Sequence, residues 1–111
     1  MAAKSRRRLE TAELNQDAEK LAYAAFLYQQ ATEKALKYII LKNGGKLPKM
    51  HDCTALAKLA QAPENVFTST ERISPYYFKT RYPDAGMDEI SSEELTLLKK
   101  AAEEVLQWTR L

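Results

Sequence analysis

Four polar side chains between positions 30 and 37 recur at helical spacing and suit a phosphate-bearing ligand. Gln30, Glu33, Lys34 and Lys37 lie at spacings of three and four residues and are expected to share one helix face. Lysine ammonium groups bind phosphate, and the Gln30 amide can hydrogen-bond a base edge or a ribose. Glu33 and Lys37 also form an i,i+4 pair that stabilises a helix without any ligand, so a structural role is an equal alternative.

His51 and Arg81 have the kinds of side chain that acid–base cleavage of a phosphodiester needs. An imidazole exchanges protons near neutral pH, and a guanidinium fork binds phosphate. They are candidate catalytic residues only if the fold, or a second subunit, brings them together. The alternative is structural: His51 precedes an N-capping Asp52, and Arg81 can pair with Asp84.

Aromatic residues flank Arg81 and are candidates for contacts with a base. Tyr77 and Tyr82 could stack on a nucleobase, although tyrosines near a helix end also pack half-buried without a ligand. Both readings stay open from the residues alone.

Residue counts exclude several kinds of site. The chain has one cysteine, Cys53, and one histidine, which rules out an intrachain disulfide framework and a His/Cys metal cluster within one chain. We therefore predict no metal and no cofactor. The longest wholly apolar run, 21–28, has 8 residues, against roughly 20 for a membrane span. With no signal peptide visible, we expect a cytoplasmic protein that does not associate with membranes.

The composition favours helices and a single domain over residues 1–111. The 111 residues include 16 Ala and 14 Leu but only 6 Val and Ile together, and β-branched residues are the ones that favour strands. Charge is uneven: residues 34–81 hold nine basic and three acidic residues, whereas residues 84–104 hold seven acidic and two basic ones. A basic middle of this kind indicates a face that attracts anions, and scattered surface charge without a partner is an equal alternative.

Local signals divide the chain into helices. Residues 1–4 are expected to fray, and a helix is expected over about 5–14, with a break at 15–17. A long helix then runs to about Asn43 and ends at Gly44, the usual position for a left-handed residue. A short helix is expected from the cap Asp52 to about Gln61, and another opens at Pro63. Ser74 can cap a further helical turn, and Ser91 with Glu94 forms a capping box for the last helix. The result is an all-α, up-and-down bundle of about five helices.

Three sequence landmarks resemble one known family. The run Tyr23-Ala24-Ala25-Phe26-Leu27-Tyr28-Gln29-Gln30-Ala31-Thr32-Glu33-Lys34-Ala35-Leu36-Lys37 is similar to the signature helix of HEPN domains (higher eukaryotes and prokaryotes nucleotide-binding). His51-Asp52 before a short helix is similar to the second landmark. Tyr77 with Arg81-Tyr82-Pro83-Asp84 is similar to the third, and together these landmarks cover residues 23–84.

The resemblance implies a helical bundle that is usually a homodimer and binds a nucleotide or RNA in a polar cleft. It implies ligand-binding roles for the matching positions, which are Gln30, Glu33, Lys34, Lys37, His51, Tyr77, Arg81, Tyr82 and Asp84. It also implies a small nucleotidyltransferase partner, because many members form a toxin–antitoxin pair with one.

Two alternatives remain for the function. Some family members are metal-independent ribonucleases with an Arg-x4-6-His motif, but here no histidine follows Arg72, Arg81 or Arg110 at that spacing. The chain therefore resembles the branch that has Arg-Tyr-Pro-Asp and lacks that motif, and a binding protein is favoured over a catalyst. The other alternative is an interaction-only helical module that dimerises through the apolar run 21–28.

Overall fold

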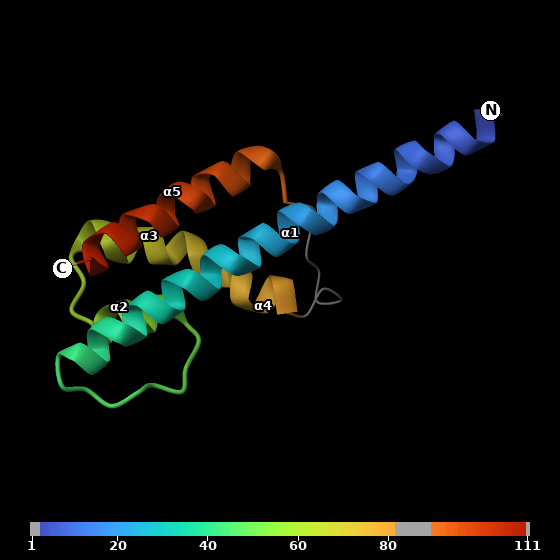
Figure 1. The fold of residues 1–111 in the computed structure, drawn as a ribbon. Helices are drawn as coiled ribbons and strands as arrows, with labels where there is room; N and C mark the ends of the chain where they lie inside the picture. Colours follow the sequence, from blue (N-terminus) through green and yellow to red (C-terminus); the bar gives the residue numbers. More distant parts are fainter. Residues whose placement is uncertain (1–2, 82–89, 111) are drawn as a thin grey trace.

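The computed structural model describes the backbone of residues 3–81 and 90–110 and the side chains of 20–78 and 90–110. Within these residues every element of secondary structure is a helix, which confirms the predicted fold class. The helices are α1 (Ala3–Lys42), α2 (Cys53–Leu59), α3 (Glu64–Ile73), α4 (Pro75–Arg81) and α5 (Ser92–Thr109) (Figure 1).

Helix α1 is one continuous helix of 40 residues, so the predicted break at 15–17 is wrong. It also begins at Ala3, within the segment expected to fray, while Met1 and Ala2 lie outside the described residues. No glycine or proline interrupts positions 3–42, and Asn or Asp inside a helix costs less than about 1 kcal/mol. Each further residue adds a backbone hydrogen bond, so the helix propagates through this weak signal.

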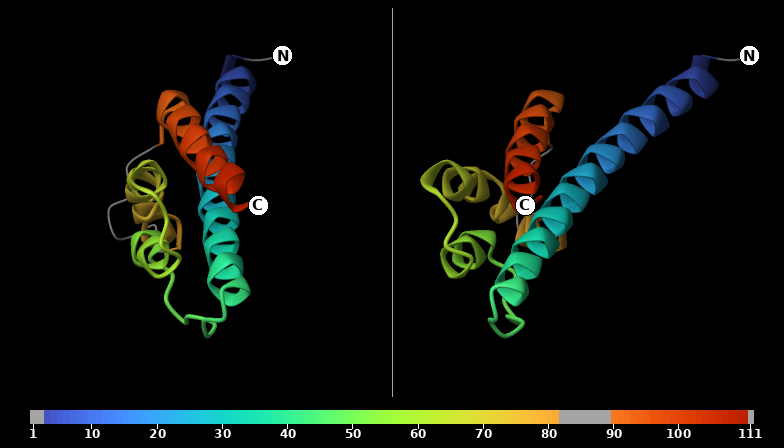
Figure 2. Two further views of the ribbon diagram at one scale, coloured as in Figure 1. Left: turned by 90° about the vertical axis from the view of Figure 1, so that its left-hand side faces the viewer. Right: turned by 60° about the vertical axis from the view of Figure 1, so that its left-hand side comes forward.

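The other helices gather along the C-terminal half of α1, and its N-terminal part extends past them (Figures 1 and 2). The molecule is accordingly elongated, with extents of 63 × 24 × 18 Å. Helix α5 packs against both α1 and α3, and α2 and α4 also contact α1. This arrangement brings Gln29 and Glu33 of α1 opposite His51 and the start of α2.

Helix α1 ends at the predicted glycine. Gly44 has a φ of +88°, and its N–H donates to the Leu41 carbonyl at 3.0 Å. The Gly45 N–H donates to the Ile40 carbonyl at 2.9 Å, which completes a Schellman motif. A Cβ on Gly45 would lie 2.8 Å from Ile40 Cγ2, so a side chain there would force a shift. The chain reverses here and runs back to His51.

Asp52 caps α2, as predicted, and also reaches the junction of α3 and α4. Its Oδ1 accepts the Thr54 N–H at 3.0 Å and the Ser74 hydroxyl at 2.5 Å. Ser74 was expected to cap the helix after it, but the structure instead shows its side chain donating to Asp52. Helix α2 ends at Leu59, two residues earlier than expected, and Gln61 there has a φ of +57°.

Helix α5 begins at its predicted cap. The Ser91 hydroxyl accepts the Glu94 N–H at 3.0 Å. The predicted capping box pairs Glu94 with Ser91, but the Glu94 carboxylate accepts from Tyr76 Oη at 3.2 Å and from Arg72 at 3.4 Å. These contacts tie the start of α5 to α3 and α4.

The core lies between α1 and the four shorter helices. Its largest fully buried apolar side chains come from every helix except α4, which adds the nearly buried Tyr76; they are Leu36, Leu56, Val66, Ile73, Leu98 and Val105. Among the described helices, none has a stretch long and apolar enough to cross a membrane.

Candidate functional site

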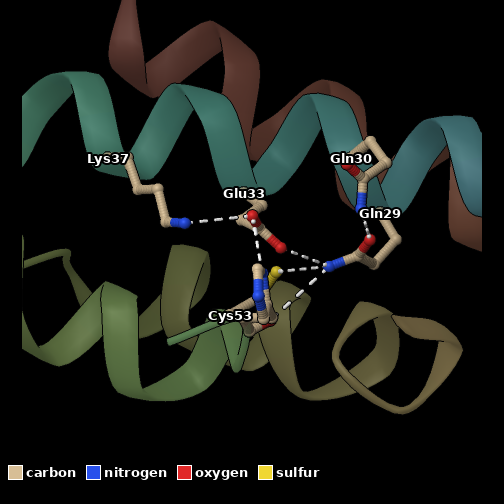
Figure 3. A network of polar contacts seen from close by, with 6 residues as sticks. Gln29, Gln30, Glu33, Lys37 and Cys53 are labelled. Carbon is tan, nitrogen blue, oxygen red and sulfur yellow. Dashed lines mark hydrogen bonds and ion pairs between the residues drawn. The ribbon is translucent and has the colours of Figure 1, made fainter. Parts of the chain in front are cut away.

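A buried carboxylate, Glu33, is the centre of a polar cluster between α1 and the loop that precedes α2 (Figure 3). Its side chain is 9% exposed. Gln29 Nε2 donates to Oε1 at 3.1 Å, and Lys37 Nζ donates to Oε2 at 3.1 Å. His51 Nδ1 lies 3.1 Å from the same Oε2. Three side chains from two segments of the chain therefore converge on one carboxylate.

The environment of Glu33 keeps it ionised at neutral pH. Burial acts to raise its pKa, but hydrogen bonds from His51, Gln29 and Lys37 and the charge of Lys37 together lower it below its usual value. An ionised carboxylate can only accept hydrogen bonds. The Nδ1 atom of His51 must therefore carry the hydrogen, which assigns the Nδ1–H tautomer whenever the ring is neutral.

The His51 ring is fixed on a second side by Tyr77 of α4. The two ring centroids are 4.5 Å apart, and the ring planes differ by 6°. The His51 side chain is still 45% exposed. An oriented imidazole thus lies at the surface, backed by a buried carboxylate and a tyrosine ring.

Gln29 stabilises this arrangement from a buried position, a role that its residue type did not indicate in the sequence. It is fully buried, and its Nε2 also lies 3.5 Å from the His51 carbonyl oxygen and 4.0 Å from Cys53 Sγ. Its Oε1 accepts a bond from Gln30 Nε2 at 2.6 Å. The available signal was its position directly after the apolar run 21–28 and four residues before Glu33.

Cys53 contributes a buried, protonated thiol to the cluster. Burial, reinforced by the nearby charge of Glu33, raises its pKa to about 12. The thiolate required of a nucleophile or a metal ligand is therefore strongly disfavoured.

The remaining candidates divide into two groups. Lys34 is exposed. It directly follows Glu33 in the sequence, but neighbouring helix positions point about 100° apart. In the described part of the chain, Lys34 is not among the residues that bond to the Glu33 carboxylate. Arg81 is the last residue of α4, one turn beyond Tyr77, and its side chain lies outside the described residues. Tyr82 and Asp84 also lie outside them.

Four apolar side chains form an exposed stripe on α1, next to the polar cluster. This α1 stripe consists of Tyr23, Leu27, Tyr38 and Leu41, which are 46–63% exposed. At 100° per residue the four lie within about 60° of one another, and Gln30 and Lys34 lie in the same sector. Ala25, on another side of the helix, is fully buried. Packing within the chain therefore covers only part of the apolar run 21–28.

A separate groove lies between α3, the start of α4 and the start of α5. It has a volume of about 450 Å³, and its lining residues are Thr68, Glu71, Arg72, Pro75, Tyr76 and Glu94. Burial and the neighbouring Glu94 raise the pKa of the Tyr76 hydroxyl. None of the residues of the Glu33 cluster lines this groove.

Comparison with known proteins gives one match. A family model described as the HEPN domain matches residues 2–111. No curated protein and no solved structure matches the chain.

Proposed function

This chain belongs to the HEPN domain family, and from that premise we propose that it binds a nucleotide or RNA at the cluster around Glu33. Membership supports a nucleotide- or RNA-related function in general. The location of the site and the nature of the partner are our proposals, and they rest on the geometry of the cluster and on the sequence landmarks.

One observation carries the proposed site: a half-exposed imidazole held between a carboxylate and a tyrosine ring. His51 is oriented by Glu33 at 3.1 Å and stacks on Tyr77 at 4.5 Å. Lys37 brings an ammonium group to the same carboxylate. A surface imidazole beside an ammonium group and an aromatic ring offers the contacts that a phosphate and a base require.

Residues around this centre extend the proposed site. Gln30 is hydrogen-bonded to Gln29 and keeps donor capacity toward a ligand. Lys34 adds an exposed charge on α1. Arg81, Tyr82 and Asp84 follow Tyr77 in the chain, and we assign them contacts with the same ligand from the motif they share with the family.

A titration at two salt concentrations tests the proposed binding. AMP and a hexauridylate RNA are the probes, each at about 50 and 200 mM salt, because phosphate contacts weaken as salt rises. Lys37→Ala should weaken binding. Lys99→Ala, an exposed lysine on α5, is the matched control and should not. The absence of binding to both probes at low salt overturns the proposal.

We further propose that the protein is a homodimer and acts with a small nucleotidyltransferase in a toxin–antitoxin type of pair. The α1 stripe supports an interface, since four large apolar side chains lie exposed along one helix face. The partner is proposed from the family resemblance. Co-purification with the product of the neighbouring gene tests the pair, and a neighbour that is no nucleotidyltransferase, or that does not co-elute, contradicts it.

A metal-independent ribonuclease is the second candidate, favoured by the Glu33–His51 contact alone. A carboxylate that orients an imidazole through Nδ1–H is the arrangement by which a histidine acts as a general base. Incubation of pure protein with RNA in the presence of a chelator tests this activity. Cleavage that His51→Ala abolishes supports it, and intact RNA excludes it.

A further inference from the structure

We propose that the Glu33 cluster binds an oxyanion of the phosphate type together with one proton, which His51 takes up. This inference rests on the proposed function, because it assumes that the ligand binds at His51. It adds the charge state in which the site accepts that ligand.

The described groups that contact or adjoin the His51 ring do not favour an anion when the ring is neutral. Helix α1 supplies the Glu33 carboxylate and the Lys37 ammonium group, which are bonded to each other. The adjacent Asp52 is ionised, because hydrogen bonds from Ser74 and Thr54 lower its pKa. Glu33, Lys37 and Asp52 together carry one net negative charge.

The other described side chains that contact or adjoin the ring add no charge to this balance. Helix α2 contributes Cys53, which stays a thiol, and α4 contributes the uncharged ring of Tyr77. Lys34 and Lys49 are exposed, where solvent screens their charges. The side chain of Arg81, one turn after Tyr77 in α4, lies outside the described residues. A proton on the ring brings the net charge of Glu33, Lys37, Asp52 and His51 to zero.

The tautomer of His51 makes the same proton necessary for a hydrogen bond. Glu33 takes the Nδ1 hydrogen, so Nε2 of the neutral ring has a lone pair and repels an oxyanion oxygen. Protonation puts a hydrogen on Nε2 and turns it into a donor. The Glu33 bond and the Tyr77 stack are compatible with both states, so the ring needs no rearrangement to change from acceptor to donor.

The expected consequence is that affinity for an oxyanion rises as the pH falls through the range in which imidazoles titrate, about 5 to 8. The ligand binds the protonated ring more tightly, so ligand binding must in turn favour proton uptake. A ligand recognised through the lone pair of Nε2 would show the opposite dependence.

The single histidine of the chain permits a direct experiment. Once any purification tag is removed, the one imidazole C2–H signal in the NMR spectrum reports the protonation of His51. Its titration is followed alone, with sulfate, and with hexauridylate; both probes keep a constant charge over about pH 5 to 8. We expect the midpoint to rise by about one pH unit with at least one probe, which equals tenfold tighter binding to the protonated form.

The two probes identify the source of the oxyanion. A rise with sulfate supports a site that takes a free anion, and a rise with hexauridylate only supports a phosphodiester of RNA. A midpoint that neither probe raises, with hexauridylate bound, overturns this inference and leaves the proposed function standing. No binding of either probe at any pH overturns both.

A variant provides an independent check. His51→Asn can still donate to Glu33 but cannot titrate, so its affinity for the probe should not change between pH 5 and 8. Lys99→Ala should keep the pH dependence of the parent. If His51→Asn is poorly folded, the wild-type NMR titration still decides the question. A His51→Asn protein that keeps the parent's pH dependence overturns the inference.

Discussion

Glu33 and His51 are 18 positions apart in the sequence, yet Oε2 of the one lies 3.1 Å from Nδ1 of the other. The contact joins the middle of α1 to the loop before α2. The contact sets the tautomer of a surface histidine. The stack on Tyr77, whose ring plane differs by 6°, sets the plane of the imidazole ring.

Replacing Glu33 with Gln should lower the free energy of unfolding by about 1–3 kcal/mol, because Lys37 and His51 lose a charged acceptor. Urea unfolding at pH 7 measures the change. Glu103→Gln is the matched control, because its carboxylate is exposed and its distance of 4.0 Å from the Lys99 ammonium group makes a weak ion pair. It should change stability by less than about 0.5 kcal/mol. Equal effects of the two substitutions would falsify the structural importance of Glu33.

The charge of Asp52 should stabilise the fold at neutral pH and stop doing so in acid. Its pKa is lowered in the folded state by Ser74 and Thr54, so the stabilisation exists above the unfolded-state value and disappears as pH falls through the folded one. Asp52→Asn can still cap α2 but cannot ionise. The stability difference between parent and variant should shrink from pH 7 to about pH 3. A constant difference across that range contradicts this account.

Gln29 should be less tolerant of change than its neighbour Gln30. Gln29→Met keeps a similar volume but removes the buried donor to Glu33 and the part-buried acceptor for Gln30. We expect a loss of about 1–3 kcal/mol in urea unfolding. Gln30→Met, at a partly exposed position, should cost less than half as much. The reverse order would show that the Gln29 contacts contribute little.

A charge in the α1 stripe should dissociate the proposed homodimer. Leu27→Glu places a carboxylate among exposed apolar side chains, and sedimentation velocity should show a shift from dimer to monomer. Leu97→Glu is the control, because Leu97 on α5 is 44% exposed, close to the 46% of Leu27. A parent protein that is already monomeric, or a Leu27→Glu protein that remains dimeric, rules out this interface.

Cys53 should react slowly with alkylating reagents in the folded protein. Its pKa of about 12 and its full burial leave almost no accessible thiolate. Iodoacetamide at pH 8 should label the native protein at least about tenfold more slowly than the urea-unfolded protein. Comparable rates would mean that the region around Gln29 opens readily.

Local signals in the sequence account for much of the fold. Asp52, Ser91 and Gly44 end or begin helices where their chemistry predicts, because caps and left-handed glycines depend on only a few neighbouring residues. The prediction of a break at 15–17 was wrong because it rested on a weak local preference. A weak local preference is overridden when helix can propagate on both sides.

Local signals in the sequence predict the site only in part. Glu33, Lys37, His51 and Tyr77 were candidates because of residue type and family landmarks, and the structure shows them in one chain of contacts. The part played by Gln29 depends on partners that lie 22 and 24 positions away, and no local pattern specifies such a contact. The placement of Lys34 on the outer side of α1 likewise follows from which face of the helix the core covers.

The bond between Asp52 and Ser74 has a consequence for the stacked rings. His51 immediately precedes Asp52, and Tyr77 follows Ser74 by three residues. This one hydrogen bond therefore joins the two backbone segments that carry the rings. The two rings are thus preorganised before a ligand binds. Less entropy is then lost on binding, and a small ligand with few contacts can still be retained.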